Sequence, residues 1–200
     1  MADDSPSQKL RLFVAIPMPE AVRNEVIRVQ HQMRQLASRD AVRWTKPEQF
    51  HLTLRFLGGV SAEQVAALQE AVHAVCLGAP ALRLRAQGIG CFPNARSPRV
   101  IWVGVNDDDG RLLDLQSEIE IAVQPFTNEP ATGKFAGHVT LGRVKSLNRS
   151  EIEKLAALAQ AVKDRQFGEW AATEVALIRS DLLPAGASHT LLASFRLGAD

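Results

Sequence analysis

The feature that most constrains this 200-residue chain is a repeated tetrapeptide of the form His-x-Thr-Leu. It occurs as His51-Leu-Thr-Leu and again as His138-Val-Thr-Leu, 87 positions further on. In both places a glycine follows, and then a segment with the spacing of a helix capping box: Ser61-Ala-Glu-Gln in the first case and Ser150-Glu-Ile-Glu in the second. The order of elements recurs, and it predicts two similar units that share one centre.

Hydrophobic periodicity predicts a mixture of strands and helices. Short apolar runs bounded by proline or glycine indicate strands, and apolar residues at steps of three and four indicate helices. We expect strands at 11–17, 50–57 (ended by Gly58-Gly59), 82–92, 99–105, 138–144, 174–180 and 190–197. We expect helices to begin at Pro19, at the two capping boxes and after the acidic turn at 107–110.

These elements do not alternate strictly enough for a doubly wound parallel sheet, so we expect an α+β fold. The duplication predicts a bilobal architecture, with two pseudo-symmetric lobes of antiparallel sheet plus helices around a central cleft. Residues 1–8 are expected to form a disordered tail, and residues 9–200 a single bilobal domain.

Composition narrows the class of protein. The formal net charge is only +1, so any contact with RNA should be local rather than spread over a basic surface. No run approaches the roughly 18 to 20 apolar residues that a membrane span requires. Two cysteines, Cys76 and Cys91, suggest no disulfide framework, and we expect a cytoplasmic monomer without a membrane partner.

Strand geometry gives the motifs a common surface. Side chains two residues apart point to the same face of a strand, so His51 projects together with Thr53. The same holds for His138 and Thr140. By chance, two such motifs should arise among five histidines in about two of ten thousand sequences of this composition.

The chemistry available to such a surface is acid–base catalysis on a phosphate. Imidazole titrates near neutral pH, so two histidines can hold opposite protonation states. Hydrolysis of a cyclic phosphodiester needs a base for the attacking water, an acid for the departing ribose oxygen, and donors for the non-bridging oxygens. The hydroxyls of Thr53 and Thr140 can supply such donors. No metal or other cofactor is expected.

Three segments carry a family resemblance: RLFVAIP at 11–17, FHLTLRFLGGV at 50–60 and FAGHVTLGRVK at 135–145. With the C-terminal stretch 176–195, they resemble the bacterial RNA 2′,3′-cyclic phosphodiesterases of the 2H phosphoesterase superfamily. The resemblance implies an RNA or nucleotide substrate with a 2′,3′-cyclic phosphate end and a 2′-phosphate product. It also implies the 2′-5′ RNA ligase activity of that family, which needs no ATP.

The resemblance assigns roles by position. It implies that His51 is the proton donor to the leaving 3′ oxygen and that His138 is the proton acceptor that activates water. Five residues beyond each histidine, it implies that Phe56 stacks on a base and that Arg143 holds the phosphate. Arg143 has the wrong strand parity to share a face with His138, unless Gly142 permits a bulge or ends the strand.

Other interpretations of the same residues remain open at this point. His51 and His138 could be structural histidines or zinc ligands, although no further ligand stands at suitable spacing. The chain could be a noncatalytic RNA-end binding module, or it could act on a small cyclic phosphate or an oligoadenylate. His189-Thr190-Leu191 resembles the motif, but its threonine comes one residue early, so we interpret it as a decoy with no part in the site.

Overall fold

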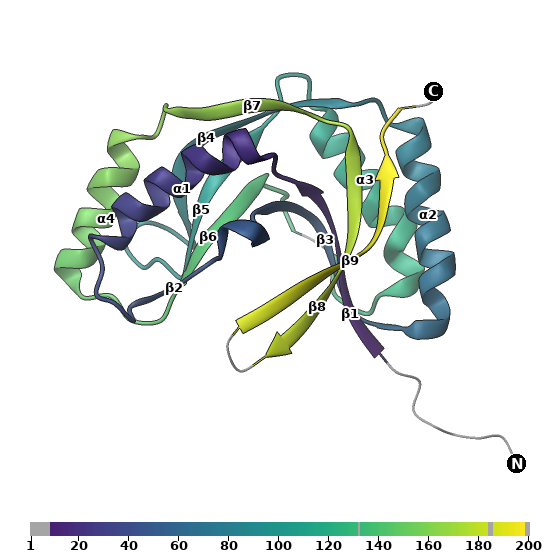
Figure 1. The fold of residues 1–200 in the computed structure, drawn as a ribbon, viewed down its shortest axis with the longest axis horizontal. Helices are drawn as coiled ribbons and strands as arrows, with labels where there is room; N and C mark the ends of the chain where they lie inside the picture. The colour runs from purple at the N-terminus through teal and green to yellow at the C-terminus, as the bar shows by residue number, and fades with distance from the viewer. Residues whose placement is uncertain (1–8, 132, 184–185, 199–200) are drawn as a thin grey trace, which may run out of the picture.

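The computed structural model describes residues 9–131, 133–183 and 186–198, so the expected tail at 1–8 lies outside the described residues. Within these ranges the strands form two antiparallel sheets, in the orders β3-β1-β8-β9 and β2-β6-β5-β4-β7 (Figure 1). The strand bounds are β1 Lys9–Pro17, β2 Val42–Trp44, β3 His51–Ser61, β4 Leu82–Phe92, β5 Val100–Asn106, β6 His138–Val144, β7 Gln166–Ala172, β8 Glu174–Leu183 and β9 Gly186–Arg196.

Helices cover one side of each sheet. They are α1 Glu20–Arg34, α2 Val65–Gly78, α3 Arg111–Val123 and α4 Arg149–Ala161, with short 3₁₀ turns η1 Pro47–Gln49, η2 Ala62–Gln64 and η3 Gln124–Phe126. Helices α2 and α3 pack on each other and contact β9 and β3, whereas α1 contacts β7 and α4 contacts β4. In Figure 1 the two helix pairs lie at opposite ends of the molecule, with the sheets between them. None of the helices in the described part of the chain has the length and hydropathy needed to cross a bilayer.

The two halves of the chain exchange strands. Strands β3 and β1 of the first half are joined in their sheet by β8 of the second half. Strands β6 and β5 of the second half are joined by β4 of the first half. The predicted α+β fold with two antiparallel lobes is therefore confirmed, and the exchange explains why each lobe depends on both halves of the chain.

The apolar faces of the helices point into the core. The apolar residues of α1 and α3 at steps of three and four are buried, and they belong to one hydrophobic cluster with the inward residues of both sheets. Burying a side chain of this size stabilises the fold by about 1.5 to 3 kcal/mol. These buried faces are Val22, Val26, Val29 and Met33 in α1, and Leu112, Leu115, Ile119 and Val123 in α3.

Three local predictions were wrong. Strand β3 does not end at Gly58 but continues to Ser61, because Gly58 adopts φ +63° at a register shift and absorbs the irregularity. Helix α4 is capped by Asn148 and Glu151 rather than by the expected pair Ser150 and Glu153. Helix α2 follows a 3₁₀ turn, in front of which Ser61 makes no side-chain capping hydrogen bond.

Candidate active site

The two motif strands meet at the centre of the molecule. Strand β3 is the edge of the four-stranded sheet, and β6 lies one strand in from the edge of the other sheet, next to β2. The two strands contact each other between the sheets. Figure 1 shows both of them in the middle of the fold. Since His51 and His138 are the first residues of these strands, both imidazoles stand at corresponding strand ends.

Both strands depart from regular alternation at the same place. In β3 the burial alternates from His51 to Leu54, but Leu54 and Arg55 are then buried in succession. In β6 the same happens at Leu141 and Gly142. Register shifts opposite β1 and β5 coincide with these positions and mark a bulge at the third residue after each histidine.

The bulges change which residues face the surface. After each bulge the strand parity is reversed, so the fifth residue beyond the histidine returns to the face that carries the histidine and the threonine. Phe56 and Arg143, which occupy this position, are both exposed. From the sequence alone, regular alternation places Arg143 on the face opposite His138. The extra residue in the bulge reverses the alternation, so Arg143 can share the face of His138.

Each imidazole is anchored to a backbone group two residues before it. His138 Nδ1 lies 2.7 Å from the carbonyl oxygen of Ala136, and His51 forms a hydrogen bond with the backbone of Gln49. A carbonyl only accepts, so Nδ1 of His138 carries the hydrogen and its Nε2 is left for a substrate. The two halves thus present their imidazoles in a similar way.

Aromatic rings line the site on both sides. The ring of Phe13 stacks on His51, with centroids 4.8 Å apart and planes at 27°. Phe92 meets His138 edge-on at 5.0 Å, and Trp102 lies 6.2 Å from the same imidazole. These rings restrict the orientation of each histidine, and they lower the polarity around it.

Burial changes the protonation of His51. It lowers the pKa of His51 to about 4, with a smaller contribution from the charge of His189, and the hydrogen bond to the backbone of Gln49 opposes both. In the free protein His51 is therefore neutral at pH 7. To act as a proton donor it must gain a proton when an anionic substrate binds beside it.

His189 was interpreted from the sequence as a decoy, and the structure contradicts that interpretation. Its ring lies 5.4 Å from the ring of His51 at an angle of 63°, and 5.1 Å from the ring of Phe13. The reasoning about strand parity was sound for the motif itself. The proximity of His189 to His51 was not predictable from the sequence. It depends on the path of hairpin β8–β9 beyond its pairing with β1, which no local sequence pattern indicates.

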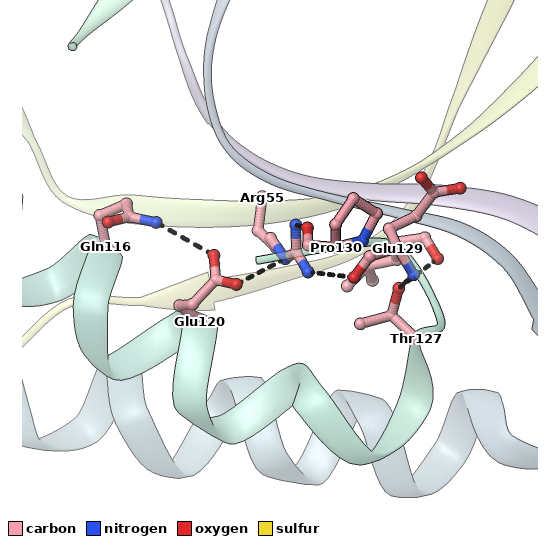
Figure 2. Close-up of polar contacts among 7 residues, drawn as sticks. Arg55, Gln116, Glu120, Thr127, Glu129 and Pro130 are labelled. Atoms are coloured by element: carbon pink, nitrogen blue, oxygen red, sulfur yellow. Dashed lines mark hydrogen bonds and ion pairs between the residues drawn. The ribbon is translucent and has the colours of Figure 1, made fainter. Parts of the chain in front are cut away.

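The sequence did not single out Arg55, which lies directly after the first bulge. Only 6% of its surface is exposed, and Figure 2 shows its guanidinium between α3 and the connection that leads to β6. Its Nη1 and Nη2 donate to the carbonyl oxygens of Pro130 and Glu129 at 2.8 and 2.9 Å, and its Nε lies 3.2 Å from Oε1 of Glu120. Through Arg55, strand β3 therefore fixes the position of the segment at 129–130, which precedes the second motif.

Neutral and acidic groups complete this network. Thr127 Oγ1 donates to the carbonyl oxygen of Leu57 and accepts from the backbone N–H of Glu129 (Figure 2). Gln116 Nε2 donates to Glu120 at 3.3 Å. In the described ranges, no three His, Cys, Asp or Glu side chains come together as a set of metal ligands.

The family model of LigT-like phosphoesterases matches this chain twice, over residues 16–102 and 103–188. The chain belongs to the LigT-like phosphoesterase family. The two matches divide it between the two motifs, in agreement with the duplication predicted from the sequence.

Known relatives resemble the whole chain. The RNA 2′,3′-cyclic phosphodiesterase of Methanothermobacter thermautotrophicus is 33% identical over 94% of this chain and all of its own length. A solved structure from Thermus thermophilus has a TM-score of 0.77 at 30% identity and covers 94% of this chain and 98% of its own. E. coli LigT, solved in complex with 3′-AMP, has a TM-score of 0.73 at 26% identity and covers 95% and 99%.

Proposed function

We propose that this protein hydrolyses RNA 2′,3′-cyclic phosphate ends to 2′-phosphomonoesters, with His51 as general acid and His138 as general base. The observation that carries the proposal is the duplicated geometry: two anchored imidazoles, each with a threonine and a further exposed side chain on one face of a bulged strand. Relatives that are RNA 2′,3′-cyclic phosphodiesterases, and the complex of E. coli LigT with 3′-AMP, support this substrate class.

The proposed reaction is an in-line displacement at phosphorus. His138 takes a proton from water as its oxygen forms a bond to phosphorus, opposite the 3′ oxygen. The bond from phosphorus to the 3′ oxygen breaks, and His51 gives its proton to that oxygen. The product carries a 2′-phosphate and a 3′-hydroxyl, and exchange with solvent restores the starting protonation states.

The side chains around the two histidines bind the phosphate and the adjacent base. The hydroxyls of Thr53 and Thr140 lie on the same strand faces as the histidines and donate to the non-bridging oxygens as charge develops there. The planar guanidinium of Arg143 suits two phosphate oxygens at once. Phe56 offers a ring on which a base can stack without regard to sequence.

Substrate binding and protonation of His51 are coupled in this scheme. An anionic phosphate beside the imidazole favours its charged form and therefore raises its pKa from the value of about 4 in the free protein. The proton that His51 later donates is taken up when the substrate binds. No step requires a metal ion, and both lobes of the site come from one chain, so we propose a metal-independent monomer. The free cysteines Cys76 and Cys91 fit the reducing cytoplasm, which we propose as its location.

The same geometry accommodates a second nucleophile. If the 5′-hydroxyl of another RNA replaces water, His138 removes its proton and the product contains a 2′-5′ linkage. This ligation needs no ATP, because the cyclic phosphate itself is the activated group. Hydrolysis prevails where water is the more abundant nucleophile.

One incubation tests the proposal. The protein is mixed with a 2′,3′-cyclic mononucleotide, and separately with an RNA oligonucleotide that ends in a 2′,3′-cyclic phosphate, both in the presence of a metal chelator. We expect 2′-phosphate products from both. A 3′-phosphate product would overturn the choice of leaving oxygen, and binding without turnover would favour a noncatalytic RNA-end binding module. Turnover of oligoadenylates or other small cyclic phosphates alone would change the substrate class.

A further inference from the structure

The hairpin β8–β9 extends beyond the strand next to it. Strand β1 pairs with β8 only over Leu12 to Ala15, opposite Arg179 to Ala176. From Ser180 onward, β8 pairs only with β9 among the described strands. Figure 1 shows the resulting arm, which projects from the sheet. A structure that leaves its sheet in this way needs other contacts to fix its position.

Two residues of the arm, Ala187 and His189, tie it to His51 and its neighbours. Gln49, the last residue of η1, donates its Nε2 hydrogen to the carbonyl oxygen of Ala187 at 2.6 Å. Two residues further along β9, the ring of His189 contacts Phe13 and His51. The arm is thus attached both to Gln49, just before the first motif, and to the ring of His51, with which the motif begins.

The rings of Phe13, His51 and His189 form a cluster, which we call the ring cluster. Phe13 stacks on one face of His51 at 27°, and His189 meets His51 at 63°. His189 also stands edge-on to Phe13 at 67°. Because each ring touches both others, His51 cannot turn far about its side-chain bonds without displacing one of its neighbours.

We propose that His189 is a positioning residue for the reaction, which holds the His51 imidazole against Phe13 from the β8–β9 arm. This inference rests on the proposed function, since it assigns His189 to the same catalytic site. His189 lies just after the second stretch matched by the family model, which ends at residue 188. The second lobe has no comparable arrangement among the described residues, because the rings beside His138 are Phe92 and Trp102, which do not titrate.

A second imidazole differs from a phenyl ring in one respect that can be measured. When His189 is protonated, its charge disfavours a proton on His51, and this repulsion adds to the effect of burial on the pKa of His51. Burial also lowers the pKa of His189 itself. Phe13 from β1 and His189 from β9 make ring contacts with His51, and the backbone of Gln49 from η1 forms a hydrogen bond with it. Of these three residues, His189 is the one whose side chain titrates.

Two substitutions separate the ring from its charge. His189→Phe keeps a ring of similar size and removes the titration, whereas His189→Ala removes the ring. His31→Ala serves as a control, because His31 is an exposed histidine on α1. For each variant, NMR titration of the imidazole signals gives the pKa of His51, and hydrolysis of a 2′,3′-cyclic nucleotide gives kcat and KM as functions of pH.

We expect His189→Phe to raise the pKa of His51 and to keep kcat at its optimum within about threefold of wild type. If His51 donates the proton, the alkaline limb of the kcat profile, which reports the substrate-bound enzyme, moves to higher pH in this variant. In His189→Ala, kcat should fall about tenfold with little change in KM, because the imidazole is no longer held in its reactive orientation. His31→Ala should match wild type in all three quantities.

The outcomes distinguish the positioning role of His189 from the proposed hydrolytic function. If wild type hydrolyses the cyclic nucleotide but neither His189 variant changes the pKa of His51 or kcat, the positioning role is overturned and the proposed function stands. If wild type shows no hydrolysis, both fail. A fall in kcat for His189→Ala with circular dichroism and thermal unfolding unchanged, together with recovery in His189→Phe, supports the positioning role.

Discussion

The strands that carry His51 and His138 have the same bulge, but different contacts support it in each strand. Both begin with an imidazole anchored two residues back, and both have a bulge at the third residue after the histidine. Behind the first bulge the fourth position is Arg55, which reaches the connection at 129–130. Behind the second it is Gly142, where an added Cβ would lie 2.7 Å from Val42 Cγ1 on β2. The duplication keeps the backbone geometry while the supporting contacts diverge.

The surface positions diverge in the same way. The fifth position is an aromatic ring in the first motif and a guanidinium in the second. The first imidazole has His189 beside it, and the second has Phe92 and Trp102. A symmetric backbone therefore carries an asymmetric site, which suits a reaction whose two sides need a proton donor and a proton acceptor. The substitutions below test where the halves are equivalent and where they are not.

The largest effect is expected where the halves are equivalent. His51→Ala and His138→Ala should each lower kcat by about 10² to 10⁴, since each removes one partner of the acid–base pair. The double variant should be little worse than either single one, because the two groups act in the same step. Turnover of a 2′,3′-cyclic nucleotide measures this, with the exposed His73→Ala as control. Near wild-type rates in both single variants would refute the assignment.

A smaller and unequal effect is expected at the fifth positions. Arg143→Met should lower kcat/KM by about 30- to 100-fold, the equivalent of losing a charge-assisted hydrogen bond to phosphate. Phe56→Leu should cost only about 5- to 10-fold, mostly in KM, because a leucine keeps apolar contact with the base but cannot stack. Steady-state kinetics on a dinucleotide that ends in a 2′,3′-cyclic phosphate would check both. Equal losses at the two positions would contradict the division of roles.

The fourth position should affect stability more than chemistry. Arg55→Met removes the buried guanidinium that contacts the carboxylate of Glu120 and two backbone carbonyls, and we expect a loss of about 3 kcal/mol in the free energy of unfolding. Urea unfolding measures this. Arg143→Met is a matched control, because it is an exposed arginine on the other motif strand and should change stability by less than about 0.5 kcal/mol. A difference between the two below about 1 kcal/mol would show that the buried network contributes little.

The smallest effect concerns the helices that follow the two motif strands. Helix α4 starts with a complete capping box, in which Asn148 accepts from the backbone N–H of Glu151 and Glu151 accepts from the backbone N–H of Asn148. Asn148→Ala should destabilise the protein by about 1 kcal/mol. Ser150→Ala, at the position that the sequence suggested as the cap, should be nearly neutral. Thermal unfolding of the two variants compares them, and an equal loss would restore the original assignment.

The strands with strong local signals were predictable. Strands β4 and β6 have the bounds expected from their apolar runs, and the expected alternation of outward and inward side chains from His138 to Leu141 is confirmed by their burial up to the bulge. Strands β2 and β7 were missed. The first has three residues, and the second, Gln166–Ala172, contains Gly168 and is held at a sheet edge by pairing with β4. Both owe their conformation to partners distant in sequence.

The features missed at the site have the same origin. A bulge inserts one residue without a local mark: Gly142 gave a hint in the second motif, but the first has Arg55 at that point. The cap of α4 was misplaced because two overlapping segments have suitable spacing. Glu151 decides between them, since its carboxylate also accepts hydrogen bonds from the backbone N–H and hydroxyl of Ser38. His189 reaches His51 only through the path of an entire hairpin.

The central claim is that the duplicated strands supply one acid and one base to a single phosphate. The measurement that tests this most directly is the dependence of kcat on pH at saturating substrate, for wild type and for the two histidine-to-alanine variants in a metal chelator. We expect a bell-shaped profile for wild type, with one limb lost in His51→Ala and the opposite limb lost in His138→Ala. Loss of the same limb in both variants, or a wild-type profile without two limbs, would contradict it.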